Sequence, residues 1–228
     1  KDFNLSVSPR RSVEELQEAV SDIQQVDGKV KHAHMWFWEG NAVDKKAFQS
    51  FRDNKPQEGT ELLERNVADK GVSANNFSSV RNLGLYYLDK STAHDSLDTR
   101  FLNAGIQNLG KFCNSEYFEV YSQKAGDERL QVESDAIRRQ IVDHIYNPLK
   151  GAIEAGDLDI KALGSAFKTF PDNIRKYLSD KFTGTHISDL ELFVEEAEKA
   201  TRDDPAKGYS AAKKLYKQSE PRLLYLGK

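Results

Sequence analysis

The sequence predicts an all-α protein built from helical hairpins joined by short turns. Apolar residues recur at three- and four-residue spacing along most of the 228 residues, which is the period of an amphipathic helix. Six prolines and fourteen glycines are too few for a sandwich rich in turns. The one weakly alternating run, Tyr117–Tyr121, has no second run to pair with as a strand. Helix pairs repeated end to end predict an irregular α-solenoid rather than a compact bundle.

Composition and charge exclude several classes of protein. Hydrophobic residues make up 38% and charged residues 30%, as in a rather polar globular protein. The net charge of −3 gives no basis for binding nucleic acid or an anionic membrane. No apolar run approaches the roughly 20 residues of a membrane helix. Cys113 is the only cysteine, which excludes an internal disulfide and fits a reducing, cytoplasmic compartment.

Two helices are expected before residue 42. Ser12–Glu15 forms a capping box, and apolar residues continue at helical spacing to Ile23, before Asp27 and Gly28 end the segment. A second helix is expected from Val30 to Trp38, where Gly40 and Asn41 break it.

A helical hairpin is expected next, with helices over residues 43–53 and 57–70. The turn between them ends at Pro56, which suits the first turn of a helix because its missing N–H costs nothing there. The apolar residues expected to face one another are Ala47, Phe48 and Phe51 in the first helix and Leu62, Leu63 and Val67 in the second.

The remaining helices follow the same reasoning. Pro148 should kink or interrupt the longest of them. The whole chain is expected to form a single elongated domain, 1–228, with a weak division near 124–130. The expected helices cover residues 73–89, 94–112, 115–123, 130–154, 158–168, 171–182, 187–201 and 205–218, with a less certain segment from Pro221.

Weak internal repeats resemble tetratricopeptide repeats. Leu83, Gly84 and Tyr87 stand where the first helix of such a repeat carries Leu-Gly and a following Tyr, and Ile106–Phe112 repeats the pattern. The offset from Leu83 to Leu109 is 26 residues, against roughly 34 in a regular array. The resemblance therefore implies a degenerate, tetratricopeptide-like solenoid, in which the glycine lets a neighbouring helix approach closely.

A second resemblance covers residues 10–72. Met35–Trp38, then Gly40-Asn41 and the helix entry Ala42–Asp44, resemble the helical region that follows the J domain in bacterial J-domain-like proteins. The resemblance implies a co-chaperone context without catalytic residues. The His-Pro-Asp triplet of a J domain is missing, because His94 and Asp95 are adjacent. The first residue is Lys, so we expect a piece of a larger protein whose J domain lies upstream.

The candidate partner-binding residues form two sets. Trp36 and Trp38 could supply an aromatic binding surface, although four consecutive apolar residues on a helix more often pack in a core. A second set, one repeat apart, could line a groove for a peptide, although Leu85 stands where a tetratricopeptide carboxylate clamp usually carries Asn. It comprises Arg81, Asn82, Asn108 and Lys111.

No pattern indicates catalysis or metal binding. His32 and His34, with Cys113, could suggest zinc, but residues two apart on a helix point about 200° apart. Adjacent carboxylates such as Glu195-Glu196 fit solvated helix faces, and Asp44 fits a helix first turn. Nucleotide-binding and hydrolase fingerprints are missing. We therefore expect no enzyme, no cofactor and no metal.

The sequence thus predicts a protein-interaction module. Its partner would be a protein or peptide: an unfolded client, or a heat-shock chaperone reached through the upstream J domain. The alternative is a structural helical scaffold or self-association domain with no chaperone role.

Overall fold

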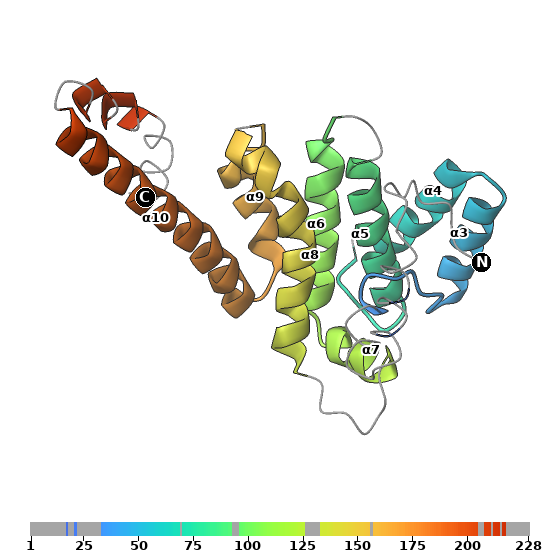
Figure 1. Ribbon diagram of the computed structural model, residues 1–228. Coiled ribbons are helices and arrows are strands. Elements are labelled where there is room, and N and C mark those ends of the chain that lie inside the picture. The colour runs from blue at the N-terminus through green and yellow to red at the C-terminus, as the bar shows by residue number, and fades with distance from the viewer. Residues whose placement is uncertain are drawn as a thin grey trace. The chain divides into compact units, whose positions relative to one another are not determined.

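The computed structural model describes residues 33–68, 70–92, 96–125, 133–155 and 157–204, together with residues 17, 21, 208–210, 212–214 and 216–217. All regular secondary structure in these residues is helical, so the all-α prediction is confirmed for them (Figure 1). Most of the helix predicted before Ile23, the segment from Pro221 and parts of 205–218 lie outside the described residues.

The chain divides into two compact units. Unit 1 comprises Lys1–Arg175 and unit 2 comprises Lys176–Lys228. The weak division that the sequence places near 124–130 falls largely in residues that are not described.

The first hairpin forms as predicted. It consists of α3 (Ala42–Arg52) and α4 (Pro56–Val67), with Pro56 in the first turn of α4. Asn54 has a φ of 59°, the left-handed conformation that asparagine tolerates in a tight turn. Ala47 and Leu63 are fully buried and share a core with Leu83 of the next helix, against which the partly buried Phe51, Leu62, Val67 and Tyr87 pack.

The second hairpin is the centre of unit 1. It consists of α5 (Phe77–Ser91) and α6 (Thr99–Cys113), which lie side by side (Figure 1). A Cβ atom on Gly84 would lie 2.9 Å from Cγ of Leu109, and one on Gly105 would lie 2.9 Å from Cγ of Leu88. The two glycines therefore allow the helices to approach closely, as the sequence predicts for Gly84.

Three helices and a 3-10 turn complete unit 1 before the long last helix. They are α7 (Tyr117–Ala125), α8 (Ser134–Ala155), α9 (Ile160–Ala166) and η1 (Phe167–Thr169). The weakly alternating run at Tyr117 is thus helical. Pro148 lies inside α8 without interrupting it. The predicted inner face of α8 is confirmed, since all four of its residues are buried: Ile137, Ile141, Ile145 and Leu149.

Several predicted helix boundaries are wrong. The helices expected to begin at residues 73 and 94 begin at Phe77 and Thr99. The helices expected over 171–182 and 187–201 form one helix of 32 residues, α10 (Asp172–Asp203), because Gly184 continues the helix rather than ending it. The helix expected through Trp38 already ends at Ala33, after which residues 34–36 turn and 37–40 have no regular structure. Among the described helices, none is long and apolar enough to cross a membrane.

Candidate functional site

The most site-like feature of unit 1 is the segment Ala33–Gly40, here called the strap. It leads into α3, whose first amides are capped by Asn41: Oδ1 accepts from the N–H groups of Val43 at 2.8 Å and Asp44 at 2.9 Å. Two hydrogen bonds lie within the strap, from the N–H of Trp36 to the carbonyl of Ala33 at 3.2 Å and from the N–H of Gly40 to the carbonyl of Trp38 at 3.0 Å. Because the strap beyond Ala33 is not helical, its other main-chain groups need further partners. Side chains of α5 and α7 supply several of them.

Arg81 of α5 holds the first half of the strap. Its guanidinium is fully buried and donates to the carbonyl oxygens of Ala33 and Trp36. Arg81 lies 4.5 Å from the ring centre of Tyr121, whose hydroxyl also donates to the carbonyl of Ala33, at 2.7 Å. Burial lowers the pKa of Arg81 from its ordinary value. The buried charge is therefore stabilised by carbonyl dipoles and an aromatic face.

Asn82 holds the second half of the strap. Its side-chain oxygen accepts from the N–H of Trp38 at 3.1 Å, and its side-chain nitrogen donates to the carbonyl of Trp38 at 2.8 Å. The same oxygen accepts from Arg81 at 3.2 Å. One amide thus pairs with both main-chain groups of one strap residue, in the way that a neighbouring strand would.

Asp44 fixes the far end of the strap from the first turn of α3. This carboxylate is fully buried, and it accepts from the hydroxyl groups of Ser78 and Ser79 and from the N–H of Gly40. Burial raises the pKa of Asp44, and these hydrogen bonds act in the opposite direction. The Asn41 side chain donates to both serine hydroxyls, so the start of α3 and the start of α5 are tied together.

His34 is buried among aromatic rings of the strap's binding surface. Its Nε2 lies 3.1 Å from Oγ of Ser122, which itself donates to the carbonyl of Phe118; Nε2 therefore carries the proton. The ring stacks on Phe118 and meets Tyr121 edge-on, both at 4.9 Å. Burial, and then the positive charges of Arg81 and Arg138, lower the pKa of His34 to about 3.

The aromatic residues of the strap point in different directions. Trp38 packs against Phe77 and Tyr121, with ring centres 5.7 and 5.0 Å apart, and Phe37 packs against Phe48. Trp36 is 46% exposed. The expectation of a helical segment buried on every side is therefore wrong for Trp36, because the strap presents one face to α5 and α7 and another to solvent.

The predicted groove residues do not meet on a surface. Arg81 and Asn82 are fully buried and occupied by the strap, so they are not available to a peptide in this conformation. Asn108 is 9% exposed and donates to the carbonyl of Ala104 in its own helix, whereas Lys111 is exposed. The physical reason is that α5 is covered on nearly all sides, so that its polar residues face other parts of the fold.

Several important residues were missed by sequence reasoning. The sequence pattern predicts a first-turn helix charge at Asp44 and indicates no role for Tyr121 or Ser122. One signal was present: the polar residues Ser78, Ser79, Arg81 and Asn82 interrupt the otherwise apolar run from Phe77 to Leu88. Polar groups in such a helix are buried and need partners.

The structure describes two of the three residues that the sequence suggests as zinc ligands. His34 is bound to Ser122, and His32 lies outside the described residues. Cys113 is fully buried, which raises the pKa of its thiol to about 12. Within the described part of the chain, no three His, Cys, Asp or Glu residues are grouped as metal ligands.

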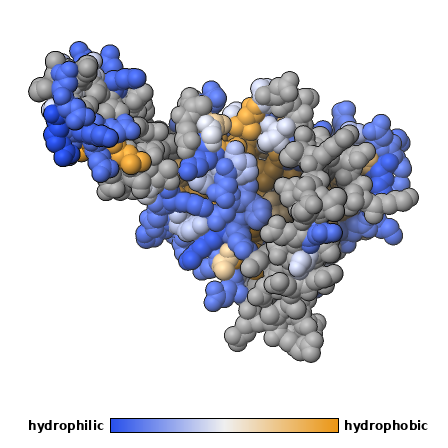
Figure 2. All heavy atoms as spheres, viewed as in Figure 1, coloured by the Kyte–Doolittle hydropathy of each residue, from blue (hydrophilic) through white to orange (hydrophobic). Residues whose placement is uncertain are grey.

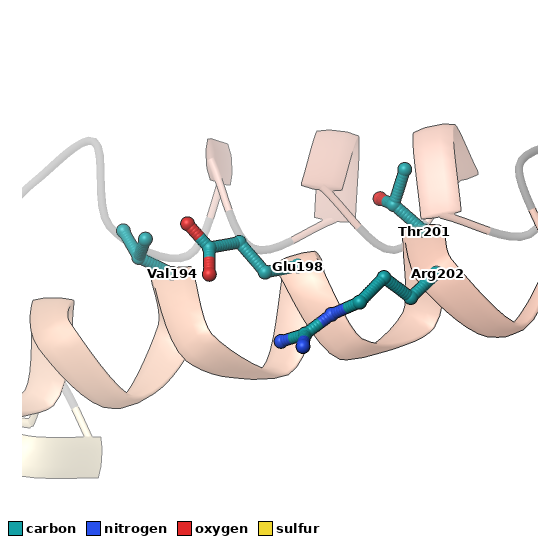
Figure 3. A pocket seen from close by; sticks show the side chains of 4 residues that line it. All are labelled: Val194, Glu198, Thr201 and Arg202. Atoms are coloured by element: carbon teal, nitrogen blue, oxygen red, sulfur yellow. The ribbon is translucent and has the colours of Figure 1, made fainter.

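Unit 2 carries an open hollow on one side of α10. Four exposed side chains line it over about two turns: Val194, Glu198, Thr201 and Arg202 (Figure 3). Large apolar side chains are exposed in the same unit, namely Leu192, Val194, Tyr209 and Tyr216. Hydrophilic residues cover most of the described surface that is visible in Figure 2, and apolar residues reach it in small groups.

The side chains of Arg81, Asn82 and Tyr121 all bind main-chain atoms, and the Asp44 carboxylate accepts hydrogen bonds. Compared with protein-family models, with curated proteins and with solved structures, the chain matches none.

Proposed function

We propose that this chain is a protein-interaction module of tetratricopeptide-like helical hairpins. It serves as the client- or partner-binding helical region of a J-domain-like co-chaperone, and it has no catalytic activity of its own. The proposal rests on the sequence resemblance over residues 10–72 and on the hairpins α3/α4 and α5/α6. The close approach of α5 and α6 at Gly84 is what the repeat pattern requires of its glycine.

The observation that carries the proposal is the position of Trp36. This large aromatic side chain is 46% exposed on a turn whose carbonyl groups are bound by the buried Arg81. Tryptophan is enriched among the residues that dominate binding energy at interfaces. A side chain held in place before binding loses little conformational entropy when a partner docks.

The binding experiment uses a permanently unfolded client, such as reduced and carboxymethylated α-lactalbumin labelled with fluorescein. Fluorescence anisotropy measures its dissociation constant for the wild-type chain and for Trp36→Ser. We expect saturable binding that Trp36→Ser weakens by at least 10-fold, about 1.4 kcal/mol.

Phe101→Ser is the matched control, because Phe101 is an exposed aromatic residue of α6 at 37% exposure. It should bind the client as the wild type does. Equal weakening by both substitutions, or no binding by the wild type, would contradict the proposal.

The J-domain context has a test of its own. The gene upstream of the codon for Lys1 should encode a helical hairpin with a His-Pro-Asp triplet in its turn. An upstream sequence without that triplet would remove the co-chaperone and leave a helical interaction module.

Self-association is a second candidate function, favoured by the apolar side chains that unit 2 exposes. Leu192 and Val194 are 57% and 58% exposed on α10, and Tyr209 is 74% exposed. Sedimentation velocity measures the mass in solution. A dimer that Val194→Asp converts to monomer would favour self-association through this unit, whereas a wild-type monomer at high concentration would refute it.

A further inference from the structure

The strap is bound in the way that a groove binds a peptide. Arg81 and Tyr121 donate to the Ala33 carbonyl, Arg81 donates to the Trp36 carbonyl, and Asn82 pairs with both main-chain groups of Trp38. The strap turns at residues 34–36, where the N–H of Trp36 donates to the Ala33 carbonyl at 3.2 Å, so these contacts suit a segment that makes the same turn. Main-chain hydrogen bonds give affinity for such a segment regardless of its side chains. Three side chains of α5 and α7 therefore bind the backbone of whatever segment occupies this position.

Pockets for two side chains give this position its specificity. Trp38 lies against Phe77 of α5 and Tyr121 of α7. His34, four residues earlier, lies between Phe118 and Tyr121 and reaches Ser122. The groove thus selects aromatic rings four residues apart, while the exposed Trp36 between them is not selected.

The charge of Arg81 requires the groove to be occupied. This buried guanidinium donates to two strap carbonyls and to Asn82, and its Nε–H has no acceptor among the described residues. Without an occupant the charge would lose the carbonyl oxygens that stabilise it. An empty groove is therefore unfavourable, and the strap fills it in the absence of another segment.

We propose that α5 and α7 form a peptide-binding groove, that the strap occupies it as an intramolecular ligand, and that an aromatic segment of a partner protein displaces the strap. This inference rests on the proposed interaction function and names its partner chemistry: a segment that supplies free carbonyl groups and aromatic rings four residues apart. The strap then regulates access to the groove.

The first experiment measures binding of a fluorescein-labelled peptide with the sequence of residues 31–42 to the full chain. In the wild type the strap competes with the peptide, so apparent affinity is reduced by the fraction of chains whose groove is free. Trp38→Ala removes the main side-chain anchor of the strap and should tighten peptide binding by at least 10-fold. Phe101→Ala, on the exposed face of α6, should bind the peptide as weakly as the wild type does.

A second measurement covers the case in which Trp38→Ala fails to fold. The same peptide, with a photoreactive benzophenone residue at its second tryptophan, is irradiated with the wild-type chain, and the cross-linked residues are mapped. Cross-links to Phe77 or Tyr121 support the groove. Cross-links that map only to other residues overturn it.

Three further outcomes separate this inference from others. Wild-type chains that exchange straps as dimers without peptide would replace the partner segment by a second copy and overturn the proposal as stated. If the unfolded client binds the wild type but the strap peptide binds no variant, the groove fails and the proposed function stands. If the peptide binds but no client does, the proposed function fails and the groove stands.

Discussion

Lowering the pH should destabilise this protein through His34. The pKa of His34 is lowered from 6.5 to about 3, first by burial and then by the charges of Arg81 and Arg138. The unfolded chain therefore takes up a proton near pH 6.5, whereas the folded chain does so only near pH 3. The stability conferred by the neutral ring is present above pH 6.5 and is lost as the pH falls toward 3.

The size of this effect follows from the span that is titrated. One pH unit corresponds to about 1.4 kcal/mol, and the unfolded chain is favoured over about two units between pH 6.5 and 4.5. The free energy of unfolding should therefore fall by roughly 2.5 kcal/mol between pH 7 and 4.5 from His34 alone.

Urea denaturation, followed by tryptophan fluorescence, measures this fall in the wild type and in His34→Phe. Phenylalanine keeps the stacking on Phe118, and Ser122 still donates to the carbonyl of Phe118, so no hydroxyl group is left unpaired. The carboxyl groups titrate in both proteins and cancel in the difference. Equal pH dependence in both proteins, or an NMR titration of His34 near pH 6.5, would refute the reasoning.

Five substitutions test the packing by thermal and urea denaturation. Gly84→Leu should lower the free energy of unfolding by about 3 kcal/mol, since a Cβ there lies 2.9 Å from Leu109. Gly151→Leu is the control: a Cβ there has no atom within 4 Å, so the loss should be under about 1 kcal/mol. Equal losses would contradict the close approach of α5 and α6. Trp38→Ala should lower the free energy of unfolding by about 3 kcal/mol, and Trp36→Ala, at an exposed residue, by about 1 kcal/mol. A larger loss for Trp36→Ala would mean that Trp36, and not Trp38, packs against the helices. Asn41→Ala should cost about 2 kcal/mol, because the cap and two serine contacts are lost together; a cost near zero would mean that water replaces them.

The hairpin of α3 and α4 shows what local sequence can predict. Its helices, its turn and the residues that face its core all follow from apolar spacing and from the position of Pro56. These signals act within a few residues of one another, so the rest of the chain is not needed to interpret them. Gly84 is similar, because a small residue at a fixed place in a repeat has one main structural use.

The strap shows where such reasoning fails. Its apolar residues fit a helix, and a helix would satisfy its own carbonyl groups. Arg81 and Asn82, more than 40 positions away, offer those groups different partners, and the burial of Trp38 and His34 adds to the gain. Which of the two conformations is more stable depends on residues that only the fold brings near.

By itself, then, the sequence determined the helical class, the first hairpin and the close approach at Gly84. Each depends on periodicity or on a single residue type, which local chemistry decides. The tertiary structure alone decided that Arg81 is buried, that Asp44 is surrounded by serine hydroxyls and that Trp36 faces solvent. Those outcomes depend on which side of a helix another segment covers, and that is set by long-range packing.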